Sequence, residues 1–360
     1  MYSTVGEPVG TAAGEEEETT CYESFIAHHP QGSFMQSSRW AQVKSQWGCE
    51  RILLWDETGA VCTAMQVLIR KIPLFPFSFL YAPRGPVGNY LEDEEVLGRL
   101  TGSIRELCRR HRAFLFKMDP MIPEDDAPSI EKLRRAGFSF TAHRRNEQLI
   151  QCRSQYVLPL SGRTEEEVFA SFHPKWRYNI RLAMRKGVTC RPYGCERLDD
   201  FCRLMEETGA RDHFQTRSRT YFQRMLTALG EHARLYLCEY QGIPLAGAIA
   251  VQYAGRTCYV YGASTSLHRE CMPNYLLQWE MIRWALESGD RLYDFQGIPY
   301  YFDETHPNYG VYRFKRGFHG EIVNYAGEFD YIPYPAVFGG VTRGWRRLPP
   351  PGALKKSGAG

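Results

Sequence analysis

The sequence predicts a mixed α/β protein built from two similar units in tandem. The chain has 360 residues, which corresponds to roughly two domains of about 150 residues each. Helical patterns, a run of short strands, and then a further helix and strand occur once before residue 155 and once after it. Because the order of elements recurs, we expect a repeat with its boundary near residue 155. The two halves share no useful residue-level identity, so the repeat is one of structure and not of sequence.

Apolar spacing and turn residues define the elements expected in the first unit. Trp40, Val43 and Trp47 recur every three or four residues and favour a short helix. Gly137 is the residue type that commonly ends a helix in the left-handed conformation. The expected helices cover 37–47, 92–111 and 130–136, and the expected strands cover 51–55, 60–71 and 114–118.

The second unit contains clearer helix starts. Thr164 and Glu167 have the spacing of a capping box, and Pro174 suits the first turn of a helix. Gly242 and Gly255 mark turns inside a three-stranded meander. The expected helices begin at 164 and 174 and cover 198–209, 218–229 and 274–288, and the expected strands cover 156–159, 235–239, 244–253, 257–264 and 292–295.

Composition excludes several classes of protein. Hydrophobic residues make up 43% of the chain and charged residues 24%, as in globular proteins, and the net charge of +3 argues against a uniformly basic nucleic-acid wrapper. The 11 cysteines include no C-x-x-C pair, so we expect reduced thiols and no metal site. The sequence lacks a signal peptide, a Gly-x-Ser-x-Gly elbow, a Walker loop, a His-Glu-x-x-His motif and a Rossmann fingerprint. We therefore expect a soluble, cytoplasmic protein.

The two ends of the chain differ from the rest in composition. Small and polar residues end in four glutamates, which predicts a disordered acidic leader over 1–20. Basic residues with Pro and Gly predict a flexible tail over 346–360. Between these ends we place a first domain at 21–155 and a second domain at 156–318.

A basic helix is expected after Pro174. Lys175 precedes Arg177, Arg181 and Arg185, which are spaced by four and therefore share one helix face, with aromatic residues between them. This pattern suits a polyanion such as an RNA backbone or a diphosphate. A solvated helix face is the alternative.

Two other segments carry residues that suit anion or oxyanion binding. Arg217 and Tyr221 are four residues apart and can hold a phosphate together, although a surface run of ion pairs explains them equally well. Lys315 lies between Phe314 and Arg316, where burial would depress its pKa or place a cation beside a developing oxyanion. A lysine at a strand edge with its amine in solvent is the alternative.

Three segments in series resemble the Fem family, the peptidoglycan-bridge aminoacyltransferases typified by FemA, FemB and FemX. They are Phe34-Met35-Gln36-Ser37 through Trp40 and Lys44, then Lys175-Trp176-Arg177-Tyr178-Asn179-Ile180-Arg181 to Gly187, and Tyr293-Asp294-Phe295 through Val311-Tyr312-Arg313-Phe314-Lys315-Arg316-Gly317-Phe318. The resemblance runs from about residue 24 to 335. It implies two tandem acetyltransferase-like (GNAT) domains with a cleft between them, and a segment at 319–345 that returns to the first domain.

The resemblance also implies a reaction. Fem proteins transfer a small amino acid (Gly, Ala or Ser) from aminoacyl-tRNA to the side-chain amine of residue 3 of a peptidoglycan stem peptide. The acceptor is UDP-MurNAc-pentapeptide or the lipid-linked precursor, and no cofactor is consumed. We expect a monomer whose basic helix contacts tRNA. Contact with the inner face of the membrane through 75–81 and the basic tail is a further hypothesis.

Site residues follow from the resemblance by position. Lys44, Arg217 and Tyr221 correspond to contacts with the diphosphate and sugar of the precursor, and Tyr261 to another residue of the cleft. Arg211 and Arg219 compete with Arg217 for its place. The implied catalytic residues are Asp119, which would meet the stem peptide, and the pair Phe314-Lys315 near the reacting ester.

Two departures from the family pattern qualify this interpretation. Only about thirty residues separate the basic helix from Arg217, which leaves no room for the coiled-coil arm of some members and indicates a compact, FemX-like chain. The pyrophosphate loop of acetyl-CoA-dependent enzymes is absent. This absence weighs against a GNAT-type acyl-CoA N-acyltransferase, which remains an alternative, as does a non-catalytic tRNA-binding or cell-wall scaffold.

Overall fold

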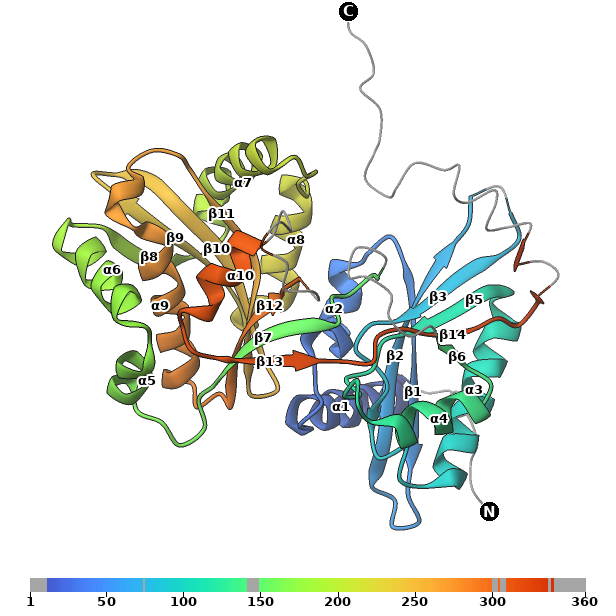
Figure 1. The fold of residues 1–360 in the computed structure, drawn as a ribbon. Coiled ribbons are helices and arrows are strands. Elements are labelled where there is room, and N and C mark those ends of the chain that lie inside the picture. Colours follow the sequence, from blue (N-terminus) through green and yellow to red (C-terminus); the bar gives the residue numbers. More distant parts are fainter. Residues whose placement is uncertain are drawn as a thin grey trace, which may run out of the picture.

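The computed structural model describes residues 12–73, 75–140, 149–299, 304, 309–335 and 338–339. Two seven-stranded mixed sheets organise these residues, one in each half of the molecule (Figure 1). Helices cover both faces of each sheet, so the expected mixed α/β class in two units is confirmed.

The first sheet has the order β1-β2-β3-β5-β14-β6, with β4 paired to β2. All neighbours are antiparallel except β3 and β5. Side chains alternate between the two faces, as Leu53 and Leu54 of β1 show by packing into different apolar clusters. The strands are β1 (Gly48–Trp55), β2 (Val61–Lys71), β3 (Ser78–Ala82), β4 (Val87–Gly88), β5 (Ala113–Met118), β6 (Ser139–Phe140) and β14 (Phe329–Tyr331).

The second sheet has the order β13-β7-β12-β11-β10-β9-β8. The expected meander is confirmed as β9, β10 and β11, and the one parallel pair among the described strands of this sheet is β11 with β12. The strands are β7 (Ser154–Pro159), β8 (Thr189–Tyr193), β9 (Ala233–Tyr240), β10 (Ile243–Tyr253), β11 (Arg256–Ser264), β12 (Leu292–Gly297) and β13 (Glu321–Asn324).

The helices follow the expected starts closely. Thr164 and Glu167 form the capping box of α5, and Pro174 occupies the first turn of α6. The helix expected over 37–47 is shorter, because it ends at Val43. The helices are α1 (Ala12–His28), α2 (Ser38–Val43), α3 (Glu94–Arg110), α4 (Ala127–Arg135), α5 (Glu165–Ser171), α6 (Pro174–Arg185), α7 (Leu198–Asp212), α8 (Arg219–Leu229), α9 (Pro273–Glu287) and α10 (Tyr309–Arg316).

The expectation of a disordered leader over 1–20 is wrong for its last part. Helix α1 begins at Ala12, and residues 1–11 lie outside the described chain. Tyr22 and Ile26, four residues apart, are fully buried, and the Tyr22 hydroxyl donates to the Gln36 carbonyl at 2.6 Å. These contacts anchor the helix.

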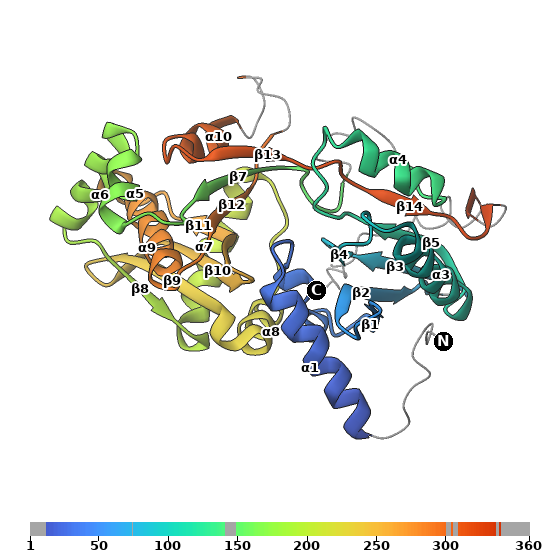
Figure 2. The same cartoon turned by 90° about the horizontal axis from the view of Figure 1, so that it is seen from below.

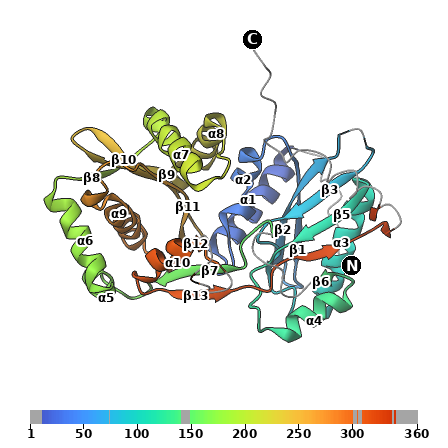
Figure 3. The same ribbon diagram turned by 45° about the horizontal axis from the view of Figure 1, so that its top comes forward.

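A shared apolar cluster joins the two halves. It contains side chains of α1 and α2 from the first half, such as Ile26 and Val43, and of α7 and α8 from the second half, such as Phe201 and Phe222. Figure 3 shows α1 and α2 on the side of the first sheet that faces the second half. The Tyr253 hydroxyl, which donates to Glu23 at 3.0 Å, adds a polar contact.

The C-terminal segment passes from one sheet to the other. Strand β13 pairs with β7 in the second sheet, and β14 then inserts between β5 and β6 of the first sheet. Figure 2 shows β13 and β14 in one line across both halves. The tail expected over 346–360 lies outside the described residues. Among the described helices, none has the length and apolar character needed to span a bilayer.

Candidate active site

The two parallel strand pairs direct their carboxyl ends toward the candidate site. In the first sheet Ala82 of β3 pairs with Met118 of β5, and Asp119 follows immediately. In the second sheet Cys258 of β11 pairs with Asp294 of β12, and the chains continue to Tyr261 and Gly297. Ligands of α/β sheets commonly bind beyond the carboxyl ends of parallel strands. Asp119 lies directly at one of these ends, and Lys315 contacts the other through the Gly297 carbonyl.

Asp119 is fully buried, and each of its two carboxylate oxygens accepts one hydrogen bond. One carboxylate oxygen accepts the hydroxyl of Tyr81 at 2.7 Å, and the other accepts the backbone N–H of Arg84 at 2.6 Å. Burial raises the pKa of Asp119 from 3.8 to about 6, although the Arg84 charge and both hydrogen bonds act in the opposite direction. A carboxyl with this pKa changes charge just below neutral pH.

Lys315 is a buried cation on α10. Its Nζ donates to the carbonyls of Gly297 at 2.7 Å and Gln296 at 3.4 Å. Burial lowers its pKa from 10.5 to about 8, and the Asp294 carboxylate partly offsets this effect. The alternative of a lysine at a strand edge is therefore wrong, because the residue lies on a helix with its amine inside the protein. Its third N–H can serve a ligand.

A buried polar chain connects Asp119 to the neighbourhood of Lys315. The Arg84 guanidinium donates to the Cys152 carbonyl at 2.8 Å. With its amide oriented so that both polar atoms are paired, Gln155 accepts from Arg84 at 3.1 Å and donates to Asp294 at 3.2 Å. Asp294 also forms an ion pair with Arg256 at 3.1 Å and accepts the backbone N–H of Gln296 at 2.7 Å. The two candidate catalytic side chains thus flank one network that bridges the halves.

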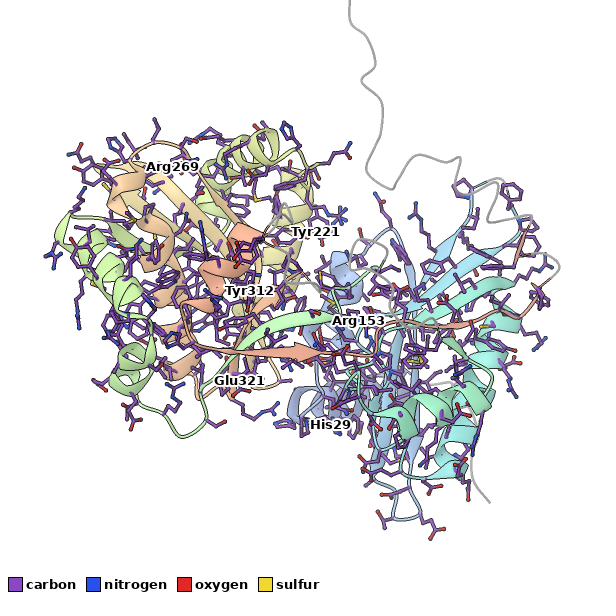
Figure 4. All side chains as sticks on the ribbon, in the orientation of Figure 1. His29, Arg153, Tyr221, Arg269, Tyr312 and Glu321 are labelled. Carbon is purple, nitrogen blue, oxygen red and sulfur yellow. The ribbon has the colours of Figure 1, made fainter. Side chains whose placement is uncertain are left out.

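A second group combines cations with aromatic rings. The Lys44 Nζ donates to the Tyr221 hydroxyl at 3.2 Å and lies 4.6 Å from the centre of the Trp40 ring. The Tyr221 and Tyr261 hydroxyls are 3.4 Å apart, and the Arg217 guanidinium lies over the Tyr221 ring. Figure 4 shows Tyr221 on the side of the second half that faces the first. Lys44, Arg217, Tyr221 and Tyr261 are therefore brought together from both halves.

Electrostatics make this second group a place for an anion. Burial, and then the nearby Arg217 charge, lower the pKa of Lys44 to about 8. Burial also raises the pKa of Tyr221, so this hydroxyl stays neutral and can donate. Two cations without a carboxylate partner in the described chain favour a negatively charged ligand between them.

The geometry separates Arg217 from its two competitors. Arg219 forms an ion pair with Asp199, and Arg211 binds Asp212 and the Ser264 carbonyl. Arg217 alone of the three lies against Tyr221.

Phe314 has mainly a packing role in this structure. Its ring contacts those of Tyr275 and Phe318, with centroids 5.2 Å and 5.5 Å away, and its carbonyl accepts the indole N–H of Trp176 at 3.0 Å. Phe314 therefore fixes α10 against α6 and α9, and through α10 it positions Lys315.

The basic face of α6 is only partly free. Arg177 donates to the carbonyls of Phe172 and Ala170, which lie at the end of α5. Arg181 lies over the Phe169 ring, and Arg185 over the ring of Tyr178. Lys175, Arg181 and Arg185 are exposed, whereas Arg177 is half-buried. Arg177 thus has a structural task that the sequence pattern did not indicate.

Sequence reasoning missed Tyr81, Arg84 and Gln155, and used Asp294 only as part of a motif. Arg84 stands in a short turn between two prolines just after a buried strand, and Asp294 is a charge inside an apolar strand. Both features are typical of buried polar residues with fixed partners. Gln155 carried no comparable signal.

A possible metal-ligating group lies apart from these residues in the sequence. His268, Glu270 and Cys271 bring one ligand atom each within 4.8 Å of one another, next to η5 (Arg269–Cys271). The Glu270 carboxylate already pairs with His268. We assign no cofactor to this group.

Comparisons with known proteins agree with the geometry. The model of the FemAB family matches residues 17–241 and 238–342. The Lipid II:glycine glycyltransferase of Staphylococcus epidermidis is 28% identical, and that of Staphylococcus aureus is 27% identical. Each alignment covers 86% of this chain and 90% of the relative.

Solved structures show the same architecture. The crystal structure of FemX matches with a TM-score of 0.82 and 25% identity, covering 90% of this chain and 97% of that one. A tandem GNAT protein from the clavulanic acid biosynthesis pathway matches with a TM-score of 0.53 and 12% identity, covering 91% and 98%, and shows likeness of fold alone. Between α6 and α8 the chain forms β8, η3 (Cys195–Arg197) and α7, without a long helical arm. From the family match over most of its length, the chain belongs to the FemAB family.

Proposed function

We propose that the protein is an aminoacyltransferase that adds a small amino acid from aminoacyl-tRNA to the side-chain amine of residue 3 of a peptidoglycan stem peptide. Glycine is the first donor to test, because the most similar relatives reported above are named as Lipid II:glycine glycyltransferases. Alanine and serine follow as the other small donors. The observation that carries the proposal is that a buried carboxyl, Asp119, and a buried lysine, Lys315, lie at the two ends of one polar network between the halves.

The chemistry is aminolysis of an ester. A neutral amine attacks the ester carbonyl, the C–N bond forms and the C–O bond to the ribose breaks. The proton lost by the amine balances the one gained by the released ribose hydroxyl. An ester is already activated, so alignment of two large substrates supplies most of the acceleration, about 7–11 kcal/mol for good orientation.

Asp119 and Lys315 have complementary tasks in this reaction. The Asp119 carboxylate holds the incoming amine in place. The Lys315 ammonium donates to the oxyanion that forms on the ester carbonyl, an effect worth about 3–4 kcal/mol for one well-placed donor. Because its other acceptors are fixed carbonyls, the cation is oriented before substrate arrives.

The Lys44 group serves the acceptor. Lys44 and Arg217 bind the diphosphate, and the Tyr221 and Tyr261 hydroxyls contact the phosphate or sugar. Lys175, Arg181 and Arg185 on the exposed face of α6 contact the RNA backbone. Arg177, also on α6, holds this helix in place by donating to carbonyls at the end of α5.

A transfer assay tests the proposal. Purified protein is incubated with tRNA charged with labelled Gly, Ala or Ser and with UDP-linked or lipid-linked stem peptide. Label in one acceptor supports the proposal and identifies donor and acceptor. Absence of transfer from every charged tRNA, together with turnover of an acyl-CoA, would instead favour an acyl-CoA N-acyltransferase.

A further inference from the structure

An exposed aromatic surface lies at the turn between β2 and β3. Phe75 is 44% exposed, and Phe77 beside it is partly exposed. Ile332 and Phe338 of the C-terminal segment pack against the same apolar cluster as Phe77. We name Phe75, Phe77, Ile332 and Phe338 the hairpin-tip surface. Figure 1 shows the end of the C-terminal segment beside this end of the first sheet.

The surface is fixed from below. Phe77, Ile332 and Phe338 pack against an apolar cluster that includes Phe79 and Phe114. The rings of Phe114 and Phe338 are stacked with centroids 6.3 Å apart. Phe77, Ile332 and Phe338 are therefore held against this end of the first sheet. Phe79 and Tyr81 are buried, so the membrane contact suggested by the sequence for residues 75–81 does not extend to them.

Cations surround this surface. Lys71 ends β2, Arg70 precedes it with its guanidinium over the Trp47 ring, and Arg112 lies beside Ser78 at the start of β5. Within the described chain none of the three forms an ion pair. The nearby Glu50 is occupied by Arg110 and His111. Exposed aromatic side chains can enter the apolar part of a bilayer, and neighbouring cations without an ion-pair partner can bind anionic headgroups.

The surface also adjoins both groups of the candidate active site. Trp47 contacts Phe79, with ring centroids 6.1 Å apart, and its backbone N–H donates to the Lys44 carbonyl at 2.7 Å. Strand β3 runs from Ser78 at the hairpin to Tyr81, the hydrogen-bond partner of Asp119. At roughly 3.3 Å per residue this is a distance of about 10 Å. A diphosphate at Lys44 therefore lies next to the surface that would meet the lipid.

We propose that the hairpin-tip surface docks the protein on an anionic lipid bilayer, and that it thereby presents the site to an acceptor whose diphosphate carries a membrane-embedded lipid. The docking is inferred from the exposed aromatic residues and cations alone, whereas the choice of acceptor rests on the proposed function.

Vesicle flotation tests the docking. Full-length protein is mixed with vesicles of phosphatidylcholine alone or with added phosphatidylglycerol. We expect binding to the anionic vesicles that weakens with salt, at least about tenfold loss for Phe75→Asp, and about fivefold loss for Lys71→Ala. Both residues are exposed, and thermal unfolding checks that each variant is folded.

Ile243→Asp is the matched control. Ile243 is 41% exposed at the turn between β9 and β10, in the other half of the molecule. This variant should float like the parent protein. Equal flotation of the Phe75 and Ile243 variants, or equal binding of the parent protein to neutral and anionic vesicles, would overturn the docking.

The acceptor arm uses the transfer assay with Phe75→Asp. Transfer to soluble UDP-linked acceptor should match the parent protein, whereas transfer to vesicle-embedded acceptor should fall about tenfold or more. Equal transfer to both acceptors would overturn the link between docking and acceptor. If the parent protein transfers to neither acceptor, the proposed function fails, and flotation still decides the docking on its own.

Discussion

Replacing Asp119 by asparagine tests whether a buried carboxyl is kept for function at a cost in stability. The carboxyl titrates at about 6 in the folded protein, against an ordinary value of 3.8. A difference of this size corresponds to about 3 kcal/mol of free energy of unfolding. The sign follows from linkage, because the folded state binds this proton more tightly. The stabilisation that Asp119 gains from binding its proton in the folded state is fully present below pH 3.8, and it is lost as the pH rises through about 6.

The experiment measures the free energy of unfolding of parent and Asp119→Asn protein in urea at pH 4.5 and pH 7.5. Over this interval Asp119 should destabilise the parent by about 2 kcal/mol, most of the full effect. The difference between variant and parent should therefore move by that amount in favour of the variant. The hydrogen bonds from Tyr81 and Arg84 favour the charged form of Asp119, so their pH-dependent part is already contained in the pKa of about 6.

Kinetics supply the second half of the test. In the parent protein, kcat/KM for transfer should fall below pH 6, because the protonated carboxyl no longer attracts the acceptor ammonium. The asparagine variant should be slower at neutral pH and should lack this acidic limb. If the free energies of unfolding of the two proteins change equally with pH, or if the fall in kcat/KM below pH 6 persists in the variant, then Asp119 is not the group that titrates.

Three further predictions concern other groups of the site. Lys315→Met should lower kcat about 100-fold or more while the protein remains folded by circular dichroism; near-normal kcat would remove Lys315 from the catalytic role. Asp294→Asn removes the nearest charge that supports the Lys315 ammonium, so the pKa of Lys315 should fall below about 8 and the alkaline limb of kcat should move to lower pH; an unmoved limb would contradict this. Arg177→Ala should lower the free energy of unfolding by about 1–2 kcal/mol, whereas Arg185→Ala should weaken tRNA binding in a filter assay without that loss; equal effects of the two would contradict the division.

Local sequence patterns were sufficient for many elements of this fold. The capping box at Thr164 and the proline at 174 start helices as expected, because such signals act within one turn. The leader was misjudged because the stability of α1 comes from Tyr22 and Ile26 packing on distant parts of the chain. The sequence of the helix itself does not show which distant residues will bury its side chains.

The site shows the same limit. Lys44, Tyr221 and Tyr261 come from distant segments, and the family resemblance, rather than any spacing, grouped them before the structure brought them together. Arg84 was overlooked because its importance depends on a backbone N–H that binds Asp119 beside the first sheet and a guanidinium that binds Gln155 in the second sheet. Such a bridge exists only after both halves have folded.

The route of the C-terminal segment has a consequence for synthesis of the protein. Strand β14 fills the space between β5 and β6, yet it is made almost 190 residues after β6, between Phe140 and Phe329. While the second half is still on the ribosome, the first sheet has two unpaired edges facing each other. We therefore expect that a chain released before residue 329 would resist proteases poorly in its first half, and that a chain containing Phe329–Tyr331 would be protected there.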